Sequence, residues 1–364
     1  MVNWYEINDC TQLDSPALVV FTDRVQHNIA EAIKMIGDVT RLRPHVKTHK
    51  SAQATALLLQ AGITKFKCAT IAEAEMLAQC QAPDVLLAYQ PTGPKLQRFI
   101  NLIKKYPATQ FSCLTDNIVA ATEQSAAFAA AQLTIPVFID LNVGMNRTGI
   151  LPNKDAIALA NQCKALDGML LKGLHAYDGH IRDTDFATKK EKCDVVYEQV
   201  ITLNNQLQLP VIIMGGSPSF SVHCKRNNIE CSPGTFIYWD KGYSHLCSEQ
   251  NFLPAAVLIT RVISLPAADK ICLDLGHKSV AAENEMSRRV FFLNAPELQP
   301  ISQSEEHLVV AAPENHTYKT GSILYALPFH ICPTVALYEK VVTCKNGNIT
   351  GTWQNIARDR ILTI

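Results

Sequence analysis

The chain has 364 residues, and its basic and acidic side chains balance to a formal net charge of +0. This balance gives no reason to expect nucleic acid or a membrane surface as a partner, so we expect a small-molecule substrate. The twelve cysteines include no Cys-x-x-Cys pair, no apolar run approaches bilayer length, and the start shows no basic stretch followed by an apolar one. We therefore expect a cytoplasmic protein with reduced thiols.

Strand and helix patterns alternate from the first apolar strand, at 18–21, to about residue 239. Strand-like runs are expected at 66–70, 85–89, 111–114, 136–141, 170–176, 211–215 and 230–232, with helical patterns between them. Together with a strand that ends at Lys47, these make eight strand and helix units, the content of an α/β chain with a (β/α)8 TIM-like barrel. An open doubly wound sheet is the alternative. Polar residues that follow the strands favour the barrel, because its strand ends meet at one mouth.

After about residue 239 the helical patterns become rare. Strand-like segments are expected at 254–265, 270–273, 289–293, 307–312, 322–326, 334–343 and 348–353. We therefore predict a barrel over 16–245 and a C-terminal β-rich domain over 246–364, which residues 1–15 join as a strand.

The most basic stretch of the chain is Arg41-Leu-Arg-Pro-His-Val-Lys-Thr-His-Lys50. If the extended form reaches Lys47, then Arg43, His45 and Lys47 share one face of a strand. Three cations on one face repel each other unless an anion or a cofactor lies among them. An amine crowded in this way loses its proton more easily, as imine formation requires. A basic surface turn is the alternative interpretation.

Two glycine-containing turns follow the seventh and eighth strands of the predicted barrel. They are Met214-Gly-Gly-Ser-Pro-Ser219 and Cys231-Ser-Pro-Gly-Thr235. Glycine lets the backbone approach a phosphate closely, and barrels often bind phosphate after these two strands. Each turn by itself could equally be an ordinary connection.

Further polar residues follow two middle strands of the predicted barrel. Arg147 lies beyond the strand at 136–141, and His175 and Tyr177 are two residues apart at the end of the strand at 170–176. The alternatives are an arginine at a helix start that pairs with an acid, and a histidine with a purely structural role. His180 lies in the loop beyond, and its role stays open.

A possible metal motif lies far from the barrel, in Pro328-Phe-His-Ile-Cys-Pro333. On a strand, His330 and Cys332 would alternate, so that imidazole and thiolate face the same point. Nitrogen and sulfur donors of this kind favour zinc, and two protein ligands leave positions open for water or substrate. A buried histidine and cysteine without a metal is the alternative.

The segment Pro44-His-Val-Lys-Thr-His-Lys50 resembles the cofactor-lysine segment of the D-threonine aldolase and D-serine dehydratase group. These are pyridoxal-phosphate enzymes related in fold to alanine racemase, and similar segments recur from Asp14 to Val335. The resemblance implies that Lys47 binds pyridoxal phosphate covalently and that a divalent metal binds at His330 and Cys332. It also implies further cofactor-binding residues, namely Arg147 near the pyridine ring, His175, Tyr177, Gly216, Ser217, Gly234, Thr235 and Tyr238. Of these residues we predict Lys47, His175 and Arg147 to be catalytic.

The resemblance also bears on the reaction. The dehydratases of this group have His-x-Cys with zinc, whereas typical aldolases have His-x-Asp with manganese or another hard metal. Cys332 therefore favours an ammonia-lyase that acts on D-serine or D-threo-3-hydroxyaspartate and uses zinc, with manganese as the alternative metal. Retro-aldol cleavage of D-threonine to glycine and an aldehyde is the alternative reaction.

Three other interpretations are an amino-acid racemase, a non-catalytic pyridoxal-phosphate-binding protein, and a metal-dependent barrel hydrolase without that cofactor. The alanine racemase arrangement further implies a homodimer. The sequence does not indicate which residue is the catalytic base.

Overall fold

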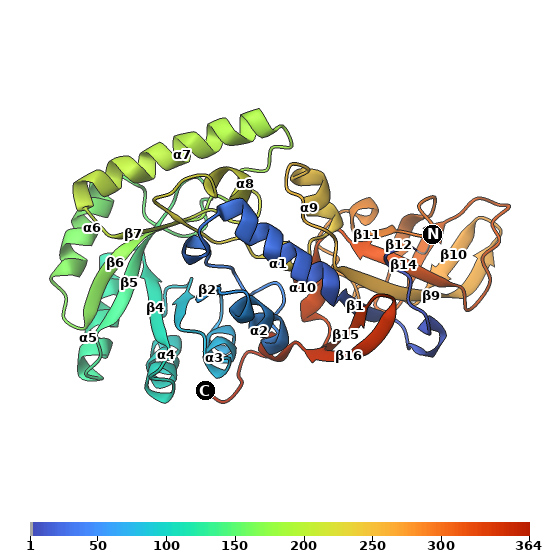
Figure 1. Ribbon diagram of the computed structural model, residues 1–364, viewed down its shortest axis with the longest axis horizontal. Coiled ribbons are helices and arrows are strands. Elements are labelled where there is room, and N and C mark those ends of the chain that lie inside the picture. The colour runs from blue at the N-terminus through green and yellow to red at the C-terminus, as the bar shows by residue number, and fades with distance from the viewer. Residues whose placement is uncertain (1–2) are drawn as a thin grey trace. The chain divides into compact units, whose positions relative to one another are not determined.

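The computed structural model describes residues 3–364, which divide into two compact units (Figure 1). The barrel unit consists of residues 32–47, 55–234 and 359–364. The sheet unit consists of the chain up to Glu31, together with 48–54 and 235–358. No helix within residues 3–364 is long and apolar enough to cross a membrane.

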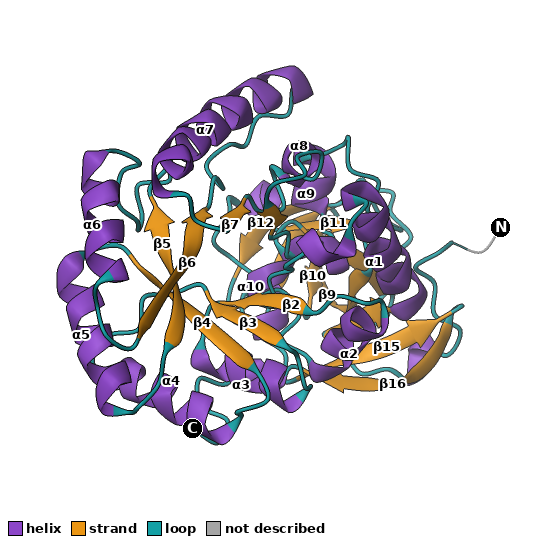
Figure 2. Ribbon diagram, turned by 60° about the vertical axis from the view of Figure 1, so that its left-hand side comes forward, coloured by secondary structure: helices purple, strands orange, loops and turns teal. Residues whose placement is uncertain are grey.

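A parallel seven-stranded sheet forms the centre of the barrel unit, and each strand pairs with the next one along the chain. The strands are β2 (Lys65–Cys68), β3 (Asp84–Leu87), β4 (Gln110–Thr115), β5 (Ile135–Leu141), β6 (Met169–Ala176), β7 (Val211–Met214) and β8 (Glu230–Cys231). The connecting helices are α3 (Ile71–Gln79), α4 (Pro94–Lys105), α5 (Ile118–Ala130), α6 (Lys154–Lys164), α7 (Phe186–Leu207) and the short α8 (Phe220–His223). Figure 2 shows α3 to α6 along the outer side of the curved sheet.

Both edges of this sheet pair with the segment just before Lys47. Leu42 forms a parallel bridge with Cys231 of β8, and His45 forms one with Lys67 of β2. Pro44 lacks an N–H, so the segment makes bridges without becoming a regular strand. The segment closes the ring as the eighth member, which confirms the predicted barrel and excludes the open doubly wound sheet.

The sheet unit contains a nine-stranded, mostly antiparallel sheet. Its strands are β1 (Ala17–Phe21), β9 (Ala256–Ala267), β10 (Lys270–Leu273), β11 (Val290–Phe292), β12 (Gln299–Gln303), β13 (Leu308–Ala311), β14 (Ile323–Pro328), β15 (Lys340–Lys345) and β16 (Asn348–Gln354). The sheet unit also contains α9 (Lys241–Leu246) and α10 (Ile331–Ala336), whereas α1 (Thr22–Ile36) and α2 (Ala52–Gln60) each have residues in both units. A β-rich domain after the barrel is therefore confirmed.

The N-terminal strand of this sheet is β1, at 17–21, and not a strand within residues 1–15 as we expected. We placed residues 1–15 there and counted 16–245 as barrel, yet β1 pairs with β9 and β15 in the sheet unit. All five residues of β1 are buried. The buried backbone N–H and C=O groups of such a strand need partners along both edges, and β9 and β15 provide them.

The predicted strand at 334–343 also differs from the structure. Its first part belongs to α10, and only β15 is extended. Pro333 lies in the first turn of α10, where proline favours helix because its missing N–H would have no partner there.

Candidate cofactor and metal sites

Arg43 belongs to an ion-pair network in the barrel unit. Its guanidinium contacts Asp84 (Nη1 to Oδ1, 2.6 Å) and Glu230 (Nε to Oε2, 2.7 Å). The repulsion that we expected among three cations on one face is therefore relieved by two carboxylates at Arg43. His45 instead accepts a hydrogen bond from the Lys47 N–H through Nδ1, at 3.2 Å, which orients the backbone at Lys47.

The structure brings together three of the residues predicted for the cofactor site. Lys47 Nζ lies 5.9 Å from the centre of the Tyr177 ring, and Arg147 Cζ lies 5.2 Å from it. Arg147 is exposed and lies in the loop between β5 and α6, so it does not start a helix. A third cation, Lys67, lies 5.8 Å from the same ring centre.

His175, at the end of β6, is buried and uses both ring nitrogens. Nδ1 is 2.6 Å from Asp140 Oδ1, and Nε2 is 3.0 Å from Lys67 Nζ. Burial, and then the charge of Lys67, lower the pKa of His175, so the ring is neutral. Burial by itself would raise the pKa of Asp140, but its hydrogen bond from His175 lowers it. We predicted His175 to be catalytic. In the structure its imidazole forms buried hydrogen bonds with Asp140 and Lys67.

Our sequence analysis did not identify Lys67 as a candidate site residue. A signal was present, because Lys65-Phe-Lys-Cys68 places a lysine in the middle of an apolar barrel strand. Side chains of a barrel strand alternate between the inside and the helices, so such a lysine is expected either to face the interior or to reach the outer surface. Phe66 and Lys67 are adjacent on β2, so their side chains point to opposite faces of the strand. Lys67 therefore faces the interior only if Phe66 faces the helices.

The two glycine turns contact each other in the barrel unit. The Gly234 N–H donates to Ser217 Oγ at 3.1 Å. A Cβ on Gly216 would lie 2.7 Å from Tyr177 Cε2, so only glycine allows this approach. The Ser232 hydroxyl is buried and finds no hydrogen-bond partner among residues 3–364. A tight glycine turn and an unpaired buried donor fit a bound phosphate group.

The other two predicted phosphate residues lie in the sheet unit. The Tyr238 hydroxyl is buried and has no hydrogen-bond partner within the described chain. It could therefore donate a hydrogen bond to a bound phosphate. Thr235 Oγ1 lies 3.5 Å from Cys332 Sγ, so its hydroxyl contacts the candidate metal ligand. We had assigned Thr235 to the phosphate only.

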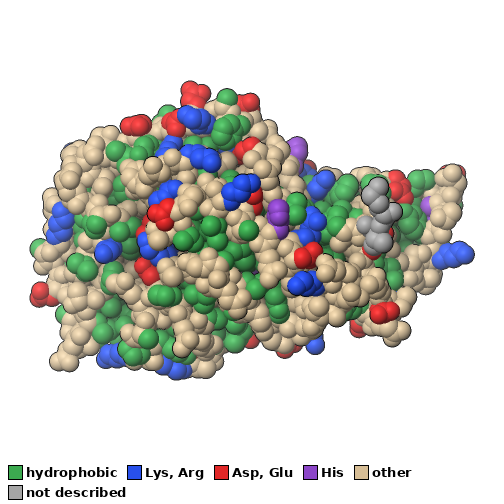
Figure 3. Space-filling view, viewed as in Figure 1, with side chains coloured by type: hydrophobic (Ala, Val, Ile, Leu, Met, Phe, Trp, Pro, Cys, Tyr) green, Lys and Arg blue, Asp and Glu red, His purple; other side chains and the backbone are tan. Residues whose placement is uncertain are grey.

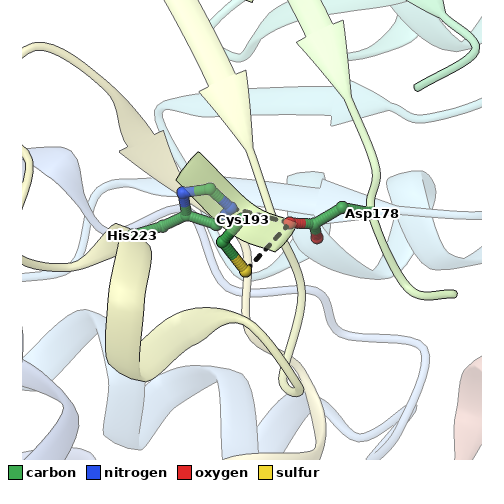
Figure 4. A group of neighbouring side chains, drawn as sticks. All are labelled: Asp178, Cys193 and His223. Carbon is green, nitrogen blue, oxygen red and sulfur yellow. Dashed lines mark hydrogen bonds and ion pairs between the residues drawn. The ribbon is translucent and has the colours of Figure 1, made fainter. Parts of the chain in front are cut away.

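Asp178, directly after Tyr177, supports the first glycine turn through Ser219 and His223, and Figure 4 shows its contact with His223. It accepts hydrogen bonds from Ser219 Oγ at 2.6 Å and His223 Nε2 at 2.7 Å, and all three side chains are buried. Ser219 Oγ in turn accepts the Gly216 N–H at 3.3 Å. Burial by itself would raise the pKa of Asp178, but the interactions with His223 and Ser219 lower it, so the carboxylate stays charged.

Asp178, Cys193 and His223 are close enough together to suggest a metal site. Their hydrogen bonds argue against one. Arg226 Nη1 lies 2.9 Å from His223 Nδ1 and can only donate, so Nε2 carries the proton that goes to Asp178. Burial, and then the charge of Asp178, raise the pKa of the Cys193 thiol to about 12. The cluster is therefore a hydrogen-bond network behind the glycine turn.

The structure corrects the secondary structure that we predicted for the metal motif, because its two residues do not alternate on a strand. β14 ends at Pro328, His330 is the N-cap of α10, and Cys332 lies in the first helical turn. The two side chains still meet. Burial would lower the pKa of His330, but its hydrogen bond with Cys332 and the charge of that thiolate raise it to about 9.

Two further side chains surround this pair. Glu283 Oε1 lies 2.5 Å from His330 Nδ1, which leaves Nε2 as the nitrogen that could bind a metal. Thr48 Oγ1 lies 3.2 Å from Cys332 Sγ, and Thr48 directly follows Lys47 in the chain. An imidazole nitrogen and a thiolate sulfur supported in this way fit zinc.

Comparisons with known proteins agree with this architecture. The family described as alanine racemase, N-terminal domain, matches residues 20–241, and a putative serine dehydratase domain matches residues 255–344. A D-threonine aldolase of Arthrobacter sp. is 25% identical over 361 residues, which cover 95% of this chain and 93% of the relative. A D-threo-3-hydroxyaspartate dehydratase of Delftia sp. is 24% identical over 376 residues, which cover 94% and 97%.

The fold is also that of a solved relative. The crystal structure of D-threonine aldolase from Filomicrobium marinum superposes with a TM-score of 0.88 at 23% identity and covers 98% of each chain. The first family model covers most of the barrel, and the second lies within the β-rich domain that follows it, in the order that we predicted. This chain therefore belongs to the D-threonine aldolase and D-serine dehydratase group of alanine racemase-like enzymes, which are pyridoxal-phosphate lyases.

Proposed function

We propose that this enzyme is a metal-dependent lyase of D-3-hydroxy amino acids and that it dehydrates its substrate to a 2-oxo acid and ammonia. The single observation that carries the choice of dehydration is the pair formed by His330 and Cys332. A thiolate ligand favours zinc over harder metals, and in this group that combination accompanies dehydration.

Each residue has a defined task in this proposal. Lys47 binds the cofactor through its amine, the turns at Gly216 and Gly234 bind the phosphate, and His330 and Cys332 bind the metal. When bound, pyridoxal phosphate accepts electrons from a bond broken at Cα, and the metal supplies a Lewis acid for the 3-hydroxyl. We assign removal of the Cα proton to the Nζ of Lys47.

Related proteins support the metal ligands. The solved structures of a D-threo-3-hydroxyaspartate dehydratase include one variant with a histidine changed to alanine and another, in metal-free form, with a cysteine changed to alanine. The two substituted positions are two residues apart in that protein, as His330 and Cys332 are here. This spacing is what we expect of a shared ligand pair.

Retro-aldol cleavage is the second candidate. It is favoured by the names of two relatives, the D-threonine aldolase of Arthrobacter sp. and a 3-hydroxy-D-aspartate aldolase of Paracoccus denitrificans, which is 24% identical over 373 residues. In that reaction a base removes the proton of the 3-hydroxyl, and the Cα–Cβ bond breaks. The two reactions differ in which proton leaves, so the products separate them.

Product analysis tests the proposal. Protein loaded with pyridoxal phosphate is incubated with D-serine, D-threonine or D-threo-3-hydroxyaspartate, each with zinc, with manganese and after chelation. We expect ammonia and a 2-oxo acid with zinc, loss of both after chelation, and no product from Lys47→Ala. Glycine and an aldehyde would replace dehydration by retro-aldol cleavage. Unchanged turnover after chelation would exclude a role for the metal.

A further inference from the structure

Lys67 crosses the interior of the barrel. It lies on β2, and its Nζ is 3.0 Å from Nε2 of His175 on β6. Three strands, β3 to β5, separate β2 from β6 on one side of the ring, and β7, β8 and the closing segment separate them on the other. The two strands therefore face each other, and the contact between Lys67 and His175 spans the interior of the barrel.

This lysine is buried without a counter-ion. Its exposed fraction is 3%, and within residues 3–364 it forms no ion pair with a carboxylate. Arg43, also buried, has two such pairs. An unpaired ammonium in a protein interior is costly, so a lysine in this position is either neutral or balanced by an anion that binds nearby.

The hydrogen bonds allow both charge states of Lys67. Asp140 holds the proton of His175 on Nδ1, so Nε2 accepts from Lys67 whether Lys67 is an ammonium or a neutral amine. The amine can thus gain or lose a proton without breaking its contact. No rearrangement of the buried chain is needed.

Several charged groups act on Lys67. Burial, and then the positive charge of Lys47, lower the pKa of Lys67 to about 7. Arg43 acts in the same direction, whereas the carboxylates of Asp140 and Asp178 oppose it. Lys47 and Lys67 lie at similar distances from the Tyr177 ring centre, 5.9 and 5.8 Å.

We propose that Lys67 is a positioning residue that gains and loses its proton at neutral pH and thereby sets the charge beside Lys47 and the bound cofactor. It acts through the hydrogen-bonded series Asp140, His175 and Lys67. The inference rests on the proposed function in one respect, because bound pyridoxal phosphate is the group that experiences this charge.

Absorption spectra of the cofactor-loaded protein test this role without turnover. The pH is varied from 5.5 to about 9, a window that brackets neutral pH, for the wild type, Lys67→Met and Lys67→Arg. Methionine is always neutral, and arginine is always charged in this range. We expect the wild-type spectrum to change with pH from one that resembles Lys67→Arg to one that resembles Lys67→Met, while neither variant shows this change. Lys65→Met is the matched control, since Lys65 lies on the same strand but is paired with Glu230.

A second measurement does not depend on the cofactor. The amine of Lys67 is titrated by NMR on lysine-labelled protein, and its signal is assigned by its loss in Lys67→Arg. A midpoint within about one unit of pH 7 supports the inference, and a midpoint near 10, ordinary for lysine, overturns it. Persistence of the wild-type spectral transition in Lys67→Met also overturns it. If the protein takes up no cofactor, the proposed function fails, and the titration still decides the state of Lys67.

Discussion

Two buried cations in the barrel unit show how local pairing decides what a charged residue does. Arg43 is neutralised by Asp84 and Glu230, which makes it part of the framework. Among residues 3–364, Lys67 has the neutral imidazole of His175 as its hydrogen-bond partner and no carboxylate, which leaves its proton exchangeable. Perturbed ionisable groups of the second kind gather at functional sites. We therefore expect the reaction to take place near Lys67. We expect the ion pairs of Arg43 to stabilise the fold.

At the same scale, Cys332 is expected to select the metal. Replacing Cys332 with aspartate exchanges a soft sulfur donor for a hard oxygen donor, so zinc affinity should fall at least about tenfold while manganese binding is kept. Metal content after dialysis against equal zinc and manganese measures this. Cys272→Ser, at a half-buried thiol of β10, is the control and should leave the ratio unchanged. An unaltered ratio in Cys332→Asp would show that Cys332 is not a ligand.

Among the elements, the glycine turn after β7 depends on contacts from two directions. Gly216 in the turn lies against the Tyr177 ring, and Ser219 at its end binds Asp178, which also binds His223. These contacts hold the shape of the turn. One substitution tests the contact with Tyr177, and another tests the hydrogen bonds to Asp178.

Gly216→Ala is expected to weaken cofactor binding. The new Cβ would lie 2.7 Å from Tyr177 Cε2, well inside normal contact, so the ring or the turn must move. We expect the Kd for pyridoxal phosphate to rise about tenfold, which corresponds to about 1.4 kcal/mol. Fluorescence titration measures it. Gly62→Ala is the control, because a Cβ there meets open space and its φ of +85° costs stability alone. Equal affinity in Gly216→Ala and the wild type would contradict this account.

Asp178→Ala is expected to destabilise the fold. Removing a fully buried carboxylate leaves the donors of Ser219 and His223 unpaired, and breaking a buried pair of this kind costs about 3–5 kcal/mol. Urea unfolding measures the loss. Asp183→Ala removes a surface pair with Lys192 and should cost at most about 1 kcal/mol. A loss below about 1 kcal/mol in Asp178→Ala would show that the network does not support the turn.

For the whole molecule, stability should fall as the solution becomes acidic. His49 is buried, and burial lowers its pKa to about 3. The unfolded chain has an ordinary histidine near 6.5, so between these values it binds one proton more than the folded chain. Stability from this group is therefore fully present above about pH 6.5 and is lost as the pH falls, by about 1.4 kcal/mol per unit.

Urea unfolding between about pH 5 and 7.5 measures this slope while unfolded carboxylates stay charged. His49→Gln should lose the part of the slope that comes from His49, whereas the part from buried His175 remains. The exposed His27→Gln should leave the slope unchanged. The same slope in His49→Gln and the wild type would assign the acid sensitivity to other groups. On the face shown in Figure 3, acidic and basic side chains are interspersed.

The sequence by itself determined the barrel, its helices and the β-rich domain, and it identified Lys47, Tyr177, His330 and Cys332 as candidate site residues. These depend on local periodicity and on short motifs, which a single chain displays directly. It did not determine that β1 joins the second sheet or that His330 and Cys332 begin a helix. It also missed the link from Lys67 to His175 and Asp140. Such features join segments far apart in the chain, so only the folded backbone decides which strand receives a partner and which buried lysine lacks a carboxylate.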